Sequence, residues 1–128
     1  MDIRNVTVVG AGTMGNGIAH VLAQHGIDVA LHDLSQQLLD KAIAVISTNL
    51  DRQVKKGTIT EEGKRSTLGR ITPSRELQLA SAGADVVIEA ATEDRKVKEQ
   101  IFNILDALLR PVSKHNKIRQ NSHLRKIL

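Results

Sequence analysis

The chain has 128 residues, no cysteine and a formal net charge of +4. This length suits one domain with its own core, and the lack of cysteine excludes a disulfide framework, a thiol nucleophile and a cysteine zinc site. The positive charge is confined to the end of the chain, because residues 1–111 carry a net charge of −1 and residues 112–128 one of +5. With no apolar run of membrane length either, we expect a cytoplasmic protein whose partners include neither nucleic acid nor a membrane.

Residues 3–15 predict a strand, a tight turn and the start of a helix. A β-branched run over residues 3–9 leads into the spacing Gly-x-Gly-x-x-Gly, which is typical of loops that bind dinucleotides. Gly10 permits the turn, Gly12 lets the backbone approach the phosphates, and Gly15 lets the helix lie close to the strand. The ligand's charge would then rest on the helix N-terminus. The residues that we predict to bind the pyrophosphate are Gly10, Ala11, Gly12, Thr13, Met14 and Gly15.

The next two elements place a carboxylate beside this turn. Helical spacing begins at Thr13 and stops at Gly26, and residues 27–32 then predict a second strand. The predicted apolar face of this helix consists of Met14, Ile18, Val21, Leu22 and His25. Asp33 follows the strand, where a carboxylate accepts the hydroxyls of an adenosine ribose and repels a 2′-phosphate. No arginine follows immediately, which favours NAD over NADP; the alternative is that Asp33 only caps the next helix.

Two successive helices are predicted after Asp33. Ser35 caps the first, a long helix whose apolar residues keep helical spacing over several turns. These apolar residues are Leu38, Leu39, Ala42, Val45, Ile46, Leu50 and Val54. The capping-box spacing Thr58-Ile-Thr-Glu61 predicts the start of a second, shorter and more polar helix.

The remaining elements complete an alternation of strands and helices. Ile71-Thr-Pro73 predicts an edge strand, residues 81–84 a loop, residues 85–89 a buried strand, and residues 92–111 a last helix. This alternation predicts an α/β fold of the Rossmann type, a doubly wound parallel sheet whose second half is incomplete. We therefore expect a dinucleotide-binding domain over residues 1–111 and a basic, disordered tail over residues 112–128.

Several longer motifs add a family resemblance. They are Val8-Val-Gly-Ala-Gly-Thr-Met-Gly-Asn-Gly-Ile-Ala-His20, Leu50-Asp-Arg-Gln-Val-Lys-Lys-Gly57 with the following Thr58-Ile-Thr-Glu-Glu62, and Val87-Ile-Glu-Ala-Ala-Thr-Glu93 with Val97-Lys98. From about Ile3 to about Pro111 the chain resembles the N-terminal domain of NAD-dependent 3-hydroxyacyl-CoA dehydrogenases, particularly the bacterial 3-hydroxybutyryl-CoA type.

This resemblance assigns expected roles. It implies that the glycine turn and Asp33 bind NAD and that Glu93 and Lys98 lie near its nicotinamide half. It also implies that Asn49 and Lys56 bind the CoA part of a 3-hydroxyacyl-CoA or 3-oxoacyl-CoA, although without the resemblance the residues favour a solvated helix face. In this family of fatty-acid metabolism, NAD accepts hydride from C3 while a histidine oriented by a glutamate takes the hydroxyl proton.

After Pro111 the sequence departs from the family pattern, which continues with a strand, an Asn-Thr-Ser-Ser segment, the catalytic histidine and glutamate, and a helical dimerisation domain. His20, His25 and His32 have no acid partner at catalytic or metal-ligand spacing, so we predict no metal site and no catalytic residue. The expectation is an oxidoreductase domain that is inactive alone and binds substrate weakly or not at all. The alternatives are a nucleotide-binding module without catalysis, and a non-functional truncated copy that self-associates through an uncovered sheet edge.

Overall fold

The computed structural model describes residues 3–90, 99 and 103. It contains a sheet of four parallel strands in the order β3-β2-β1-β4, which confirms the predicted α/β fold of the Rossmann type. In chain order the elements are β1 (Asn5–Val9), α1 (Thr13–Gln24), β2 (Asp28–His32), α2 (Gln36–Lys56), α3 (Glu61–Gly69), β3 (Ile71–Ser74), α4 (Leu77–Ser81) and β4 (Val86–Glu89). The predicted helix over residues 92–111 and the basic tail lie outside the described residues.

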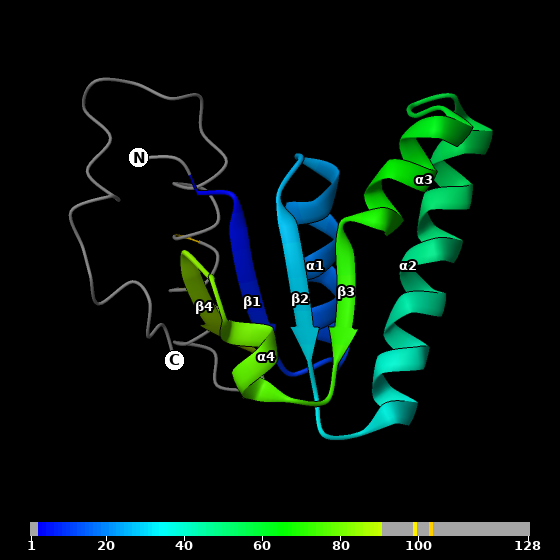
Figure 1. The fold of residues 1–128 in the computed structure, drawn as a ribbon. Coiled ribbons are helices and arrows are strands. Elements are labelled where there is room, and N and C mark those ends of the chain that lie inside the picture. Colours follow the sequence, from blue (N-terminus) through cyan, green and yellow to red (C-terminus); the bar gives the residue numbers. More distant parts are fainter. Residues whose placement is uncertain (1–2, 91–98, 100–102, 104–128) are drawn as a thin grey trace.

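The four strands point in the same direction, so their carboxyl ends all lie at the same end of the sheet (Figure 1). The turns from β1 to α1 and from β2 to α2 both lie at this carboxyl end, where open parallel sheets bind ligands. β3 is an edge strand, as Pro73 predicts. No helix in the described part of the chain is both long and apolar enough to cross a membrane.

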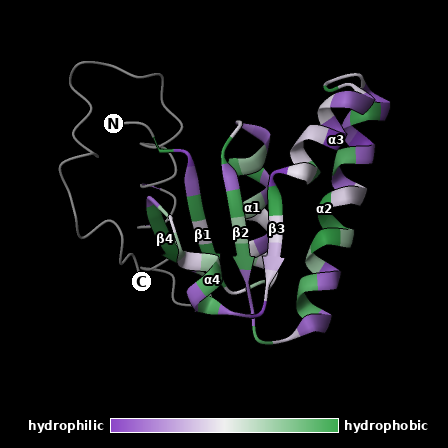
Figure 2. Cartoon of the chain, viewed as in Figure 1, coloured by the Kyte–Doolittle hydropathy of each residue, from purple (hydrophilic) through white to green (hydrophobic). Residues whose placement is uncertain are grey.

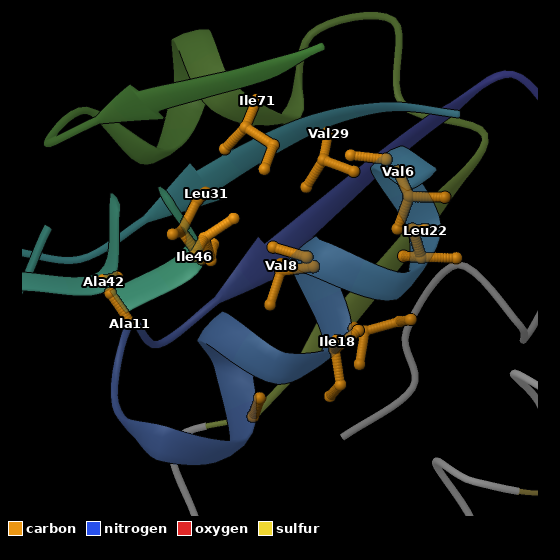
Figure 3. Close-up of a cluster of buried hydrophobic side chains, with 14 of the residues drawn as sticks. Val6, Val8, Ala11, Ile18, Leu22, Val29, Leu31, Ala42, Ile46 and Ile71 are labelled. Carbon is orange, nitrogen blue, oxygen red and sulfur yellow. The ribbon is translucent and has the colours of Figure 1, made fainter. Parts of the chain in front are cut away.

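The core lies between the sheet and the helices α1 and α2. Alternate residues of the strands point to this side, among them Val8 and Leu31 (Figure 3). Val8 pairs in register with Leu31 and Ile88, and all three residues are fully buried. The largest fully buried apolar residues of this core are Val6, Val8, Leu22, Leu31, Leu39, Ile46, Leu50, Val86 and Ile88. Figure 2 shows the same pattern as apolar stretches along the strands and more polar outer helix faces. On the opposite face of the sheet, the Thr7 hydroxyl donates to the Ala80 carbonyl of α4 over 2.5 Å.

The predicted apolar face of α1 is wrong at two positions. Val21 is 39% exposed and His25 is exposed, whereas Ile18 and Leu22 are buried as predicted. The helix ends at Gln24 and His25 is its C-cap, so the periodic pattern stops before the last predicted residue. Gly26 has φ +89°, a left-handed conformation that ends the helix where the sequence predicts.

Of the two predicted helix caps, one is confirmed and one is displaced. The Ser35 hydroxyl accepts the Leu38 N–H over 3.2 Å at the start of α2. At α3 the cap is Thr60, not Thr58, because Thr60 Oγ1 accepts the Gly63 N–H over 3.0 Å. The Thr58 hydroxyl instead donates to a carbonyl in the last turn of α2, so Thr58 belongs to the end of that helix.

The short helix α4 is not predicted from the sequence. Its apolar side chains Leu77 and Leu79 are 47% and 69% exposed, and only Ala80 is buried. A helix of five residues with one buried position gives no apolar period to detect. The strand after it begins at Val86, one residue later than predicted, and the Asp85 carboxylate accepts the N–H groups of Arg4 and Asn5 at the start of β1.

Candidate dinucleotide-binding site

The turn between β1 and α1 depends on two of its three glycines for steric reasons. Gly10 has φ 106°, a conformation that L side chains rarely adopt. A Cβ added at Gly15 would lie 1.7 Å from the Gly10 carbonyl oxygen, so the first turn of the helix touches the preceding turn directly. At Gly12 a Cβ would meet nothing within 4 Å, and the residue is exposed. The space beside Gly12 is therefore open to a ligand, as a backbone that approaches phosphates requires.

The N-terminus of α1 offers backbone donors at this open space. Gly12 is the N-cap residue, and the first helical hydrogen bond runs from the Asn16 N–H to the Gly12 carbonyl over 2.9 Å. No side chain caps the helix, and its first turn contains no acidic residue. The N–H groups of Thr13, Met14 and Gly15 thus have no partner one turn back, which suits an anion.

Asp33 is held at the mouth of the turn by two backbone N–H groups. Its Oδ2 accepts the Ala11 N–H over 3.0 Å, and its Oδ1 accepts the Ser35 N–H over 2.9 Å. Ser35 is the N-cap of α2, so Asp33 is not the cap residue itself. Since each carboxylate oxygen has two lone pairs, both oxygens keep capacity for another donor, such as the two hydroxyls of a ribose.

The surroundings of Asp33 keep it ionised. Burial raises its pKa, but the hydrogen bonds from the Ala11 and Ser35 N–H groups, the adjacent Leu34 backbone N–H and the nearby His32 together hold the pKa below the ordinary value of 3.8. A negative charge is therefore present at neutral pH. In a dinucleotide-binding fold, a carboxylate at the end of the second strand attracts ribose hydroxyls and repels a 2′-phosphate.

The ends of three strands fix the turn and the carboxylate relative to each other. The Gly10 N–H donates to the His32 carbonyl at the end of β2, and the Ala90 N–H donates to the Val9 carbonyl, each over 2.7 Å. Ala90 follows β4 and is buried beside the site. The predicted contacts Glu93 and Lys98, which come next in the chain, lie outside the described residues.

A hollow of about 190 Å³ lies elsewhere in the described residues. It is lined by the first residues of β1 and β2, by Arg70 before β3, and by residues of α4 such as Leu79. These are the amino ends of the strands, whereas ligands of open parallel sheets bind at the carboxyl ends. The hollow is therefore separate from the glycine turn.

Comparison with known proteins agrees with this geometry. Residues 5–113 match the family model described as "3-hydroxyacyl-CoA dehydrogenase, NAD binding domain". The chain belongs to the 3-hydroxyacyl-CoA dehydrogenase family. It is the NAD-binding domain of that family, and its cofactor is NAD.

Relatives in this family are whole enzymes of which the chain spans a part. It is 49% identical over 109 residues to 3-hydroxybutyryl-CoA dehydrogenase of Bradyrhizobium diazoefficiens, covering 85% of this chain and 37% of that protein. It is 43% identical over 102 residues to 3-hydroxyadipyl-CoA dehydrogenase of Escherichia coli, covering 80% and 21%. The crystal structure of (S)-3-hydroxybutyryl-CoA dehydrogenase from Ralstonia eutropha matches with a TM-score of 0.69 and 41% identity, covering 90% of this chain and 39% of that one.

In this NAD-binding domain the predicted CoA residues lie far from the glycine turn. Asn49 and Lys56 are on α2, which runs away from the carboxyl ends of the strands (Figure 1). At a rise of about 1.5 Å per residue, they lie roughly 20 and 30 Å along the helix from Gln36. Asn49 Oδ1 accepts from the Arg52 guanidinium over 3.4 Å, and Lys56 is exposed.

The three histidines of the described residues each bond to a neighbour. His20 Nε2 lies 2.9 Å from Gln24 Oε1, and His25 Nδ1 lies 2.8 Å from the Val21 carbonyl oxygen. His32 Nδ1 lies 3.1 Å from the Ser74 carbonyl oxygen, so this contact joins the ends of β2 and β3. None of these rings is directed by a carboxylate toward the glycine turn, and the described residues contain no group of three His, Cys, Asp or Glu able to hold a metal ion.

One residue near the site has no counterpart in the sequence predictions. Arg75 follows β3, and its Nε donates to the Leu34 carbonyl over 3.1 Å, directly after Asp33. It is far from Asp33 in the chain, so no local motif marks it. The only sequence signal is indirect. Asp33 and Arg75 each follow a predicted strand, and neighbouring parallel strands bring their carboxyl ends together.

Proposed function

We propose that this domain supplies the cofactor half of an NAD-dependent 3-hydroxyacyl-CoA dehydrogenase that oxidises the 3-hydroxyl of a substrate such as 3-hydroxybutyryl-CoA. The observation that carries the proposal is the Asp33 carboxylate, which the Ala11 N–H holds against the glycine turn. The named activities of its relatives support the substrate class, since several are 3-hydroxybutyryl-CoA dehydrogenases.

The residues of the turn would bind and orient the cofactor. The open N–H groups of the first turn of α1 would hold the pyrophosphate, and Asp33 would accept both hydroxyls of the adenosine ribose. Bound NAD supplies the acceptor for the hydride that leaves C3 of the substrate. Glu93 and Lys98, two residues carried over from the family resemblance, are proposed to lie toward the nicotinamide.

Asn49 and Lys56 are proposed as contacts for the CoA portion. Lys56 is an exposed cation in the last turn of α2, and phosphate groups bind well to such donors. The far end of α2 is supported by α3, since Lys64 of α3 forms an ion pair with Asp51 of α2. An exposed cation at the end of α2, which an ion pair links to α3, is a suitable contact for the phosphate groups of CoA.

We further propose that the 128-residue polypeptide does not turn over alone. Reaction at C3 requires a base for the hydroxyl proton, and each histidine of the described residues is occupied by a local partner. Weak or absent binding of acyl-CoA by this polypeptide, its self-association and its cytoplasmic location stay predictions.

Calorimetric titration with NAD tests the cofactor role. We expect micromolar binding that Asp33→Ala weakens by about tenfold or more, because hydrogen bonds to a charged group are lost. Asp40→Ala is the matched control, since Asp40 is an exposed acid on α2 that bonds only to the Gln36 side chain among the described contacts. Folded protein that does not bind NAD would overturn the proposal.

An assay with acetoacetyl-CoA and NADH tests the proposal about turnover. We expect no oxidation of NADH by the polypeptide alone. Clear turnover that Asp33→Ala abolishes would show that the polypeptide holds a base that we have not identified.

A further inference from the structure

Residues at the end of β3 form hydrogen bonds to the segment that carries Asp33. The Ser74 carbonyl lies 3.3 Å from the Asp33 backbone nitrogen and 3.1 Å from His32 Nδ1, so the last residue of β3 holds the end of β2 twice. Arg75 adds a third contact through its Nε, which donates to the Leu34 carbonyl over 3.1 Å. Three consecutive residues, 32–34, are thus fixed from the neighbouring strand.

The backbone around Arg75 is itself held in place. The Ser74 hydroxyl lies 3.2 Å from both the backbone nitrogen and the carbonyl oxygen of Glu76, which closes a small turn with Arg75 at its centre. The guanidinium is consequently directed to the Leu34 carbonyl by a fixed turn. Its position beside Asp33 follows from the parallel register, in which His32 pairs with Ser74.

Most of the hydrogen-bonding capacity of Arg75 remains unused. A guanidinium has five N–H donors, and among the described residues only the Nε bond to Leu34 is made. The side chain is exposed and forms no ion pair with a carboxylate in the described part of the chain. Arginine with a free planar edge is the side chain best suited to bind a phosphate through two parallel hydrogen bonds.

We propose that Arg75 is a cofactor-specificity residue, a cation held beside the 2′ position of the adenosine ribose and opposed there by Asp33. With Asp33 present, the carboxylate binds the ribose hydroxyls and repels a 2′-phosphate, so the site takes NAD. When the charge of Asp33 is removed, Arg75 binds the 2′-phosphate and the same site takes NADP. This inference rests on the proposed cofactor site at the glycine turn.

Calorimetric titrations with NAD and NADP test the inference in four proteins: wild type, Asp33→Ser, Asp33→Ser with Arg75→Gln, and Asp33→Ser with Arg65→Gln. Asp33→Ser is expected to raise the ratio of NADP affinity to NAD affinity by about tenfold or more, as a charge-assisted phosphate contact provides. Arg75→Gln should remove most of that gain. Arg65→Gln should not, because Arg65 is an exposed arginine on α3 and loses the same charge far from the turn.

Each outcome has a defined meaning. A gain that survives Arg75→Gln, or no gain in folded Asp33→Ser, overturns the role of Arg75. If Asp33→Ser does not fold, single Arg75→Gln and Arg65→Gln variants at low salt decide: Arg75→Gln should lower NADP affinity relative to NAD by about threefold, and an equal effect of Arg65→Gln overturns the proposal. Absence of NAD binding by the wild type overturns the proposed function instead.

Discussion

Replacing Gly15 by alanine tests the steric basis of the glycine turn. The added Cβ would lie 1.7 Å from the Gly10 carbonyl oxygen and 2.8 Å from its carbonyl carbon. Ordinary contact begins at 3.4 Å, so α1 and the turn must separate by about 1.7 Å. The obstructing atoms are backbone atoms, which cannot move aside as the end of a flexible side chain can.

The energetic cost follows from two opposing terms. Overpacking of this kind costs about 1–3 kcal/mol, and alanine returns about 0.8–1 kcal/mol of helix propensity. Because the steric clash is with a rigid backbone, we expect a value at the upper end and a net loss of about 2 kcal/mol in the free energy of unfolding. The displaced turn also moves the N–H groups that are proposed to hold the pyrophosphate, so NAD affinity should fall by about tenfold or more.

Urea unfolding followed by circular dichroism and calorimetric titration with NAD measure these two effects. Gly17→Ala is the matched control, since Gly17 lies in the same helix, is exposed and has nothing within 4 Å of an added Cβ. It should stabilise the protein by about 0.5–1 kcal/mol. Gly15→Ala with wild-type stability and NAD affinity would refute the argument, as would destabilisation by Gly17→Ala of the same size.

Three further predictions concern single side chains. The pKa of Asp33 is lower in the folded than in the unfolded state, so its ionised carboxylate stabilises the fold above the ordinary value of 3.8, and this stabilisation is lost as pH falls through the folded pKa. Thermal melts from about pH 6 to pH 2 should therefore show the stability of the wild type falling toward that of Asp33→Asn. Parallel curves of melting temperature against pH for the two proteins would contradict this. Thr60→Ala should cost about 1 kcal/mol in urea unfolding and Thr58→Ala less, because Thr60 is the cap; a larger loss in Thr58→Ala would place the cap at Thr58. If the CoA binding expected of this polypeptide is weak but measurable, Lys56→Ala should lower the CoA affinity by about two- to fivefold and leave NAD affinity unchanged. Lys55→Ala, one position around the helix, should change neither affinity, and equal losses in the two variants would indicate a general charge effect.

The parts of the site that the sequence predicts are those set by local geometry. The need for glycine at Gly10 and Gly15 arises within one turn of chain, from a positive φ and from a single close contact. Asp33 is found because the length of one helix and one strand fixes where the second strand ends. For the same reason the buried strands β1 and β2 are predicted to within two residues of their observed bounds.

The parts that it misses depend on choices between equivalent groups or on distant segments. Thr58 and Thr60 have the same hydroxyl, and only the path of the chain after α2 decides which one caps α3. The helix that contains Leu79 buries too little apolar surface to leave a pattern. The contact of Arg75 with Leu34 joins two strands, so it needs the pairing of β2 with β3 before it can be recognised.

The length of α2 sets the distance between the proposed ligand contacts at Asp33 and Lys56. A continuous helix of 21 residues separates Lys56 from the turn at Asp33 by a distance at which substitutions are normally additive. On the proposed roles of these two residues, a substitution at Lys56 and one at Asp33 should therefore change stability and binding additively. The proposed cofactor contact and the proposed carrier contact could then each be altered by mutation, in evolution or in the laboratory, with little effect of one change on the other.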